Sequence, residues 1–185
     1  MNKLTTSQQK ILKSIHLISA GLWLSSVIIL MLLPIIYRNI TTGDELYMYN
    51  LVYYFIDMFI LTPAAIFTLL TGLIYSLFTN WGFFRHGWLV YKWVVTLLII
   101  LVGTFYLGPL VTKSLEIANT KRLASLQDQN YTHGEMVGLY AAIINSSLLI
   151  IAVCFSVYKP WKNINKFKIA HNHANAADAE HSAAD

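Results

Sequence analysis

The chain has 185 residues, of which 56% are hydrophobic and only 12% are charged, and its formal net charge is +4. Soluble domains carry roughly 25% charged residues, so this composition excludes an ordinary soluble globular protein. The basic residues flank long apolar runs and form no stripe of their own, which argues against a nucleic-acid partner. We therefore expect an integral membrane protein whose main partner is the lipid bilayer.

Four uncharged runs are long enough to cross a bilayer, which takes about 20 residues. They predict an all-α fold, a four-transmembrane-helix bundle with antiparallel up-down topology and helices at about 8–37, 47–78, 88–111 and 136–158. These helices form one transmembrane domain, 1–161. The polar segment 162–185 is expected to be a disordered tail, because it has too little apolar surface to fold.

Local signals mark some of the helix ends. Thr5-Thr6-Ser7-Gln8 fits the capping box that opens a helix. The second helix is longer than the bilayer requires, so tilt, a bend at Pro63 or protrusion must absorb the excess. Leucines and charges alternate from Ser114 to Gln129, which predicts either an amphipathic helix at the membrane interface or a continuation of the third helix beyond the membrane.

The basic residues predict the orientation of the bundle. Eight of them lie on the side of the two termini and four lie on the opposite side, so the positive-inside rule places both termini in the cytoplasm. The first group is Lys3, Lys10, Lys13, Arg85, Lys159, Lys162, Lys166 and Lys168, and the second group is Arg38, Lys113, Lys121 and Arg122.

Two ionisable residues lie inside the apolar runs at a similar depth. His16 follows the start of the first run and Lys92 follows the start of the third, which puts both about 6–8 Å into the hydrocarbon from the cytoplasmic side. They could meet across a helix interface or around a common ligand. An intramembrane charge marks a functional site by default. The alternatives are a lysine that reaches back to the interface and a neutral histidine bonded to a nearby hydroxyl or carbonyl.

Further polar residues extend this pattern along the other helices. Asp57 is expected about 15 Å from the outer end of the second helix, where it would carry a proton unless it has a partner. It serves either as a hydrogen bonder between helices or as part of a proton or cation path. Thr71 and Asn145 add polar groups to the faces of the second and fourth helices.

A neutral imidazole is the usual axial ligand of haem iron, and a four-helix bundle can hold a porphyrin between its helices. His16 would be the metal ligand, Lys92 the partner of an anionic group, and Trp23 and Trp88 packing walls. The apolar runs contain no second histidine, which argues against a cytochrome with two histidine ligands. A five-coordinate haem, a mixed ligand pair and no haem stay open.

Two short motifs resemble known membrane families. The run Ser14-Ile15-His16-Leu17-Ile18-Ser19-Ala20-Gly21-Leu22-Trp23 resembles the first helix of the bacterial membrane protoporphyrinogen oxidases called HemJ and of copper-resistance D-type membrane proteins. Trp88-Leu89-Val90-Tyr91-Lys92 resembles the opening of a later HemJ helix. That family keeps an essential histidine and lysine there, associated with haem b, so the resemblance implies haem or porphyrin contact at His16 and Lys92.

The chain also departs from HemJ. Pro34 is followed by Ile35, where HemJ proteins have a basic residue after the first-helix proline. The second helix is more similar to an uncharacterised family of small bacterial integral membrane proteins in the same broad grouping. We therefore expect a distant relative in the bacterial inner, or cytoplasmic, membrane.

Three functions follow from these observations. The first is binding of haem b or a porphyrin in the cytoplasmic half of the bundle, in a redox or haem-related role. The second is a non-enzymatic membrane subunit or a small ion or metal transporter that uses Asp57 and Lys92. The third is a structural protein whose polar groups only join helices. A homo-oligomer and a membrane redox partner are both compatible with the sequence, and whether the protein is an enzyme stays open.

Overall fold

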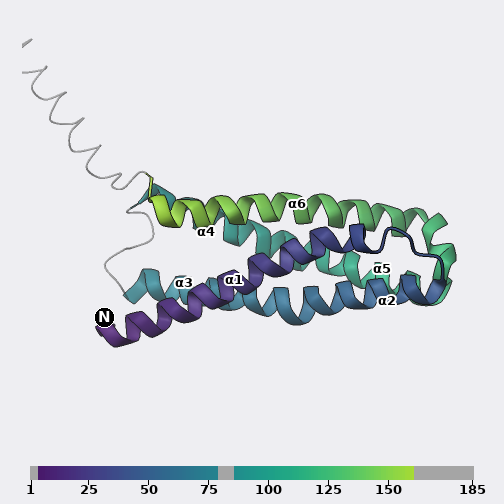
Figure 1. Cartoon of the computed structure of the whole chain (residues 1–185). Coiled ribbons are helices and arrows are strands. Elements are labelled where there is room, and N and C mark those ends of the chain that lie inside the picture. Colours follow the sequence, from purple (N-terminus) through teal and green to yellow (C-terminus); the bar gives the residue numbers. More distant parts are fainter. Residues whose placement is uncertain (1–3, 79–85, 161–185) are drawn as a thin grey trace, which may run out of the picture.

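The computed structural model describes residues 4–78 and 86–160 (Figure 1). All regular elements in these two ranges are helical. They are α1 (Thr6–Ile36), α2 (Gly43–Phe55), the π-helical segment η1 (Ile56–Leu61), α3 (Thr62–Phe78), α4 (Gly87–Val102), the π-helical segment η2 (Gly103–Leu107), α5 (Gly108–Lys121), the 3₁₀ segment η3 (Arg122–Gln127) and α6 (Gln129–Tyr158). The predicted tail, 162–185, lies outside the described residues.

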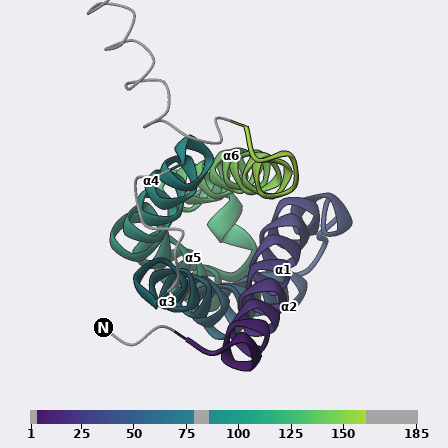
Figure 2. The same ribbon diagram turned by 90° about the vertical axis from the view of Figure 1, so that its left-hand side faces the viewer.

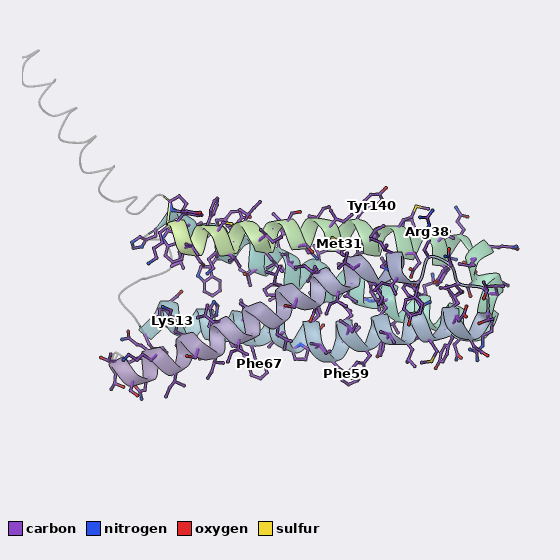
Figure 3. All side chains as sticks on the ribbon, viewed as in Figure 1. Lys13, Met31, Arg38, Phe59, Phe67 and Tyr140 are labelled. Carbon is purple, nitrogen blue, oxygen red and sulfur yellow. The ribbon has the colours of Figure 1, made fainter. Side chains whose placement is uncertain are left out.

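These elements join into four helices that are long and apolar enough to cross a membrane: Thr6–Ile36, Gly43–Phe78, Gly87–Gln127 and Gln129–Tyr158. Large apolar side chains cover the outside of the bundle, and Phe59, Phe67 and Tyr140 project away from it in Figure 3. Such a surface suits lipid. In water it would be a large continuous area of exposed apolar side chains, which soluble proteins rarely have. The prediction of an all-helical fold with four helices long and apolar enough to cross a membrane is confirmed for the described residues.

The helices are longer at one end than the hydropathy pattern predicts. The second begins at Gly43 where 47 was expected, and the fourth begins at Gln129 where 136 was expected. The third continues past 111 through α5, so the stretch after Ser114 is a continuation of that helix. At 1.5 Å per residue the 41 residues of this third long helix, Gly87–Gln127, span about 60 Å, which is roughly twice the thickness of a hydrocarbon core of about 30 Å. Part of it must therefore lie outside the apolar slab.

Side-chain caps explain where three of the helices begin. Thr5 and Gln8 form the predicted capping box before α1, and Thr42 and Glu45 form a second one before α2. Asp128 accepts hydrogen bonds from the backbone at the start of α6. Lys121 donates to the same carboxylate and holds its pKa below the usual range. Polar capping residues thus start helices at positions that lie outside the apolar runs of the sequence.

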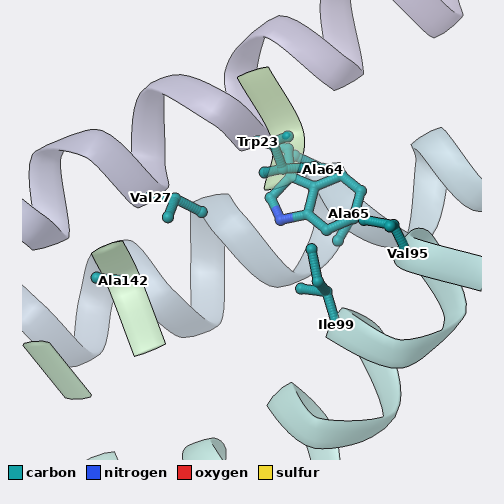
Figure 4. Close-up of a cluster of buried hydrophobic side chains, with 8 residues drawn as sticks. Trp23, Val27, Ala64, Ala65, Val95, Ile99 and Ala142 are labelled. Atoms are coloured by element: carbon teal, nitrogen blue, oxygen red, sulfur yellow. The ribbon is translucent and has the colours of Figure 1, made fainter. Parts of the chain in front are cut away.

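Four helices surround the centre of the bundle. In Figure 2, which looks along it, α1, α3, α4 and α6 lie around the perimeter, and each contacts two of the others. Trp23, 1% exposed, lies at the middle of this ring. It packs with small and branched side chains from all four helices, which together we call the Trp23 layer: Trp23, Val27, Ala64, Ala65, Val95, Ile99, Ala142 and Leu149 (Figure 4).

The other end of the molecule has a second core. There α2 lies against α5, at the right of Figure 1. Two leucines, two tyrosines and one alanine from four segments form this cluster: Leu33, Leu46, Tyr49, Ala118 and Tyr131. The outer surface of α5 carries exposed Lys113, Glu116 and Lys121. Because those charges require water, this end is an extension of the bundle beyond its lipid-covered part.

Two prolines widen the helices at the junction between the bundle and this extension. Proline has no N–H, and its ring clashes with the carbonyl of residue i−4 in a regular α-helix. Pro63 and Pro109 each lie two residues after a π-helical segment, η1 and η2. In each segment a backbone N–H reaches back five residues, from Thr62 to Asp57 and from Gly108 to Gly103. Such wide turns are frequent at functional sites.

We predict that Gly43→Ala destabilises the protein. A Cβ at Gly43 would lie 2.6 Å from Cβ of Arg122 and 3.2 Å from the backbone nitrogen of Leu123, so α2 and η3 would have to separate. Overpacking of this kind costs about 1–3 kcal/mol. The thermal unfolding midpoint in detergent measures the effect.

The matched control is Gly21→Ala. A Cβ at Gly21 meets nothing within 4 Å, and alanine favours a helix over glycine by about 0.5–1 kcal/mol, so this variant should be at least as stable as the parent. Equal midpoints for the two variants would contradict the close packing of α2 on η3.

Candidate functional site

His16 is held by the polar face of α3. Its ring nitrogen Nδ1 lies 2.9 Å from Oγ1 of Thr71. The Thr71 hydroxyl has a single proton and donates it to the backbone carbonyl of Phe67 at 2.6 Å, so it accepts from His16. With the Thr71 proton on the Phe67 carbonyl, Nδ1 carries the ring proton of a neutral His16 and Nε2 carries the lone pair. Of the alternatives open in the sequence, this is the neutral histidine bonded to a hydroxyl.

Lys92 is held by α6. Its Nζ donates to Oγ of Ser156 at 2.7 Å and lies 5.7 Å from the centre of the Trp88 ring. The side chain is half-buried and turned toward a neighbouring helix. Lys92 and His16 interact electrostatically, although their hydrogen bonds go to different helices, α6 and α3.

A cavity of about 190 Å³ lies between the helices beyond the Trp23 layer. It follows α1 from Trp23 to Pro34, and both π-helical segments line it. His16 and Lys92 are not among the lining residues. Its polar lining comes from six segments and consists of Tyr49, Asn50, Tyr53, Asp57, Thr62, Thr104, Ser114, Glu135 and Asn145. The cavity is thus a second polar region, separate from the one around His16.

Two carboxyl groups line this cavity from opposite helices. Glu135, on α6, accepts a hydrogen bond of 2.7 Å from the hydroxyl of Tyr49. The carboxyl of Asp57, on η1, has no hydrogen bond and no ion pair with any residue in the described ranges, although the residue is only partly exposed. Burying an unpaired charge is expensive. Asp57 is therefore a group that gains from a cation or a proton.

Tyrosines surround the carboxyl groups. The Tyr53 hydroxyl lies so close to α6 that a Cβ at Gly138 would meet it at 3.3 Å. The Tyr49 and Tyr53 rings contact each other with their centres 6.2 Å apart. Asn50 donates to the hydroxyl of Tyr131 at 2.9 Å, which joins α2 to α6 behind the cavity. The carboxyl end of the cavity is therefore an aromatic and polar wall.

The opposite end of the cavity is formed by Trp23. Its indole Nε1 is buried and has no hydrogen-bond partner among the described residues. Figure 4 shows the nitrogen edge of the ring on the side of Val27 and Ala142, which both line the cavity. An indole N–H is only a donor, and leaving a buried donor unsatisfied costs about 1–3 kcal/mol. The unsatisfied N–H of Trp23 therefore indicates that a bound ligand supplies the acceptor, because no described residue does.

The predicted site residues therefore fall into two regions. Near the start of α1 and α4 are His16 with Thr71 and Lys92 with Trp88, while the cavity holds Trp23, Asp57 and Asn145. Glu135 was missed, because it precedes the predicted start of the fourth helix. Asp128 was an available signal, since an aspartate before Gln129 is a good helix cap and would have placed Glu135 inside the helix.

Comparison of the chain with protein-family models, with curated proteins and with solved structures finds no match. Within residues 4–78 and 86–160, no three His, Cys, Asp or Glu side chains lie close enough together to hold a metal ion. Function has to be argued from the two polar regions themselves.

We predict that Thr71→Val lowers the stability of the protein by about 1–3 kcal/mol, because it leaves the Nδ1–H of His16 without its hydroxyl acceptor. Thr71→Ser keeps the hydroxyl and should lose much less. Thermal unfolding in detergent, followed by circular dichroism, compares the two. If the valine variant is no less stable than the serine variant, the assigned hydrogen bond is wrong.

Proposed function

We propose that the protein is a small transporter of protons or cations in the bacterial inner membrane, with antiparallel helices and both termini in the cytoplasm. The excess of basic residues on the side of the termini supports this orientation. One observation carries the proposal, the cavity between the helices that Asp57 and Glu135 line. Ionisable groups that face a cavity inside a membrane bundle mark ion and proton pathways.

The chemistry of the cavity suits exchange between a proton and a cation. An ionised carboxylate without a partner is disfavoured inside the bundle, so Asp57 is stabilised either by binding a proton or by binding a cation. Glu135 already has a donor in Tyr49 and still has a second carboxylate oxygen for a ligand. Competition between the two species for these carboxyls would couple their movements.

The region around His16 and Lys92 lies on the other side of the Trp23 layer. In this proposal it belongs to the cytoplasmic half of the pathway. His16 can accept a proton on Nε2, because Nδ1 is committed to Thr71. The Lys92 ammonium repels a cation that has passed the layer.

We predict that Asp57→Asn and Glu135→Gln each reduce cation-driven proton movement at least tenfold. The measurement uses the purified full chain in proteoliposomes that contain a pH-sensitive dye. The control, Glu116→Gln, removes an exposed carboxylate of α5 and should retain the parent rate. A parent protein that moves neither protons nor cations would refute the proposal, and so would an Asp57→Asn variant as active as the parent.

The hydrogen bond of His16 through Nδ1 favours haem binding as a second candidate function. A histidine that donates through Nδ1 to an oxygen and keeps Nε2 free is prepared for a metal ion. His16 would hold the iron and Lys92 would pair with a propionate, while the haem would supply electron transfer or oxygen chemistry. The resemblance of the His16 and Lys92 motifs to HemJ-type proteins supports this candidate. The cavity does not, because neither residue lines it.

We predict a Soret band in the visible spectrum of the protein if it is purified after expression with sufficient haem. His16→Ala should abolish the band, because it removes the iron ligand. His133→Ala should not, because His133 is exposed on α6. A folded but colourless parent protein ends the haem proposal and leaves the transport proposal intact.

A further inference from the structure

The lining of the cavity contains two unsatisfied groups of opposite kinds. The indole N–H of Trp23 is 99% buried, lacks an acceptor among the described residues and borders the cavity. The carboxyl of Asp57, which also lines the cavity, lacks a donor or a cation among the described residues. One ligand that carries both an acceptor and a positive charge would satisfy the two groups together.

The walls around the carboxyls favour an organic cation over a metal ion. Tyr49 and Tyr53 present aromatic rings beside Asp57 and Glu135. Aromatic rings attract alkylammonium groups through their negative faces, and rings around a cation are the common way to recognise choline-like groups. A bare metal ion would leave the Trp23 N–H unpaired. Moreover, no group of three potential metal ligands occurs within the described ranges.

The volume of the cavity limits the size of the ligand. A protein cavity of about 150 Å³ accepts benzene, which has six carbon atoms. The volume here is about 190 Å³, so the ligand has roughly six to ten non-hydrogen atoms. An alkylammonium group joined by a short chain to a hydroxyl or carbonyl oxygen fits this limit.

We infer that the cavity binds a small organic cation with an oxygen acceptor, in which the ammonium lies at the unpartnered carboxyl of Asp57 and the oxygen accepts from Nε1 of Trp23. This inference rests on the proposed cation function and names the substrate class of the same site. Choline is the probe of this class, with its quaternary ammonium and its hydroxyl two carbons apart.

Three probes separate the parts of the inference. Calorimetric titration of the full chain, purified in a maltoside detergent, compares choline with 3,3-dimethylbutan-1-ol and with tetramethylammonium. The alcohol has the shape of choline without its charge, and tetramethylammonium has the charge without the oxygen. Choline should bind at least tenfold more tightly than the alcohol and at least threefold more tightly than tetramethylammonium. Equal affinities for choline and the alcohol, or no choline binding, would overturn the inference without the use of any variant.

Variants then assign each end of the ligand. Asp57→Asn should weaken both cationic probes at least tenfold and leave the alcohol unchanged. Trp23→Phe keeps an aromatic ring but removes the N–H, so it should weaken choline at least threefold and leave tetramethylammonium unchanged. Glu116→Gln should bind all three probes as the parent does. Unchanged binding of the alcohol by Asp57→Asn, and of tetramethylammonium by Trp23→Phe, shows that each variant is folded. A variant that weakens the binding of all three probes equally would contradict the assigned contact.

The ammonium could also belong to a phospholipid headgroup. The maltoside detergent contains no ammonium, so choline binding in it shows that a free solute is sufficient to occupy the site. Displacement of a bound lipid by a phosphocholine detergent, without binding of free choline, would overturn the inference. Choline binding without transport would refute the proposed function alone, whereas proton or sodium transport without choline binding would refute only the ligand class.

Discussion

Two of the prolines inside the long helices shape the interior of this bundle. Pro63 and Pro109 interrupt the ladders of two long helices that lie in an apolar environment, where every carbonyl still needs a donor. The chain meets that need with wide turns in η1 and η2. These turns also line the cavity and present Asp57 to it. The prolines therefore connect the backbone chemistry of the helices to the polar interior.

The two polar regions differ in how far the protein satisfies its own groups. His16 has Thr71, and Lys92 has Ser156 and the ring of Trp88, so each is explained by contacts between helices. Asp57 and the indole of Trp23 have no such partners among the described residues. A buried group without a partner is costly unless something else binds it. That contrast, more than the presence of ionisable residues, points to the cavity as the place where the protein acts.

The sequence predicted the coarse fold well, because four long apolar runs leave few alternatives to four membrane helices. The helix starts at Gly43 and Gln129 were missed because hydropathy outweighed the caps at Thr42 and Asp128. Periodicity showed that His16 and Thr71 lie on polar faces, but it could not predict their bond, which depends on the register between α1 and α3. The Trp23 layer, the cavity and the role of Glu135 likewise depend on how distant segments pack.

The Trp23 layer also has an electrical consequence. A transmembrane voltage falls most steeply across material of low dielectric constant, and water-accessible regions on either side of a dry layer would confine most of the drop to its thickness. Moving one elementary charge through 100 mV involves about 2.3 kcal/mol. A charge that crosses the plane of the Trp23 indole would therefore exchange most of that energy with the field within a few turns of helix, across the thickness of the eight side chains of the layer.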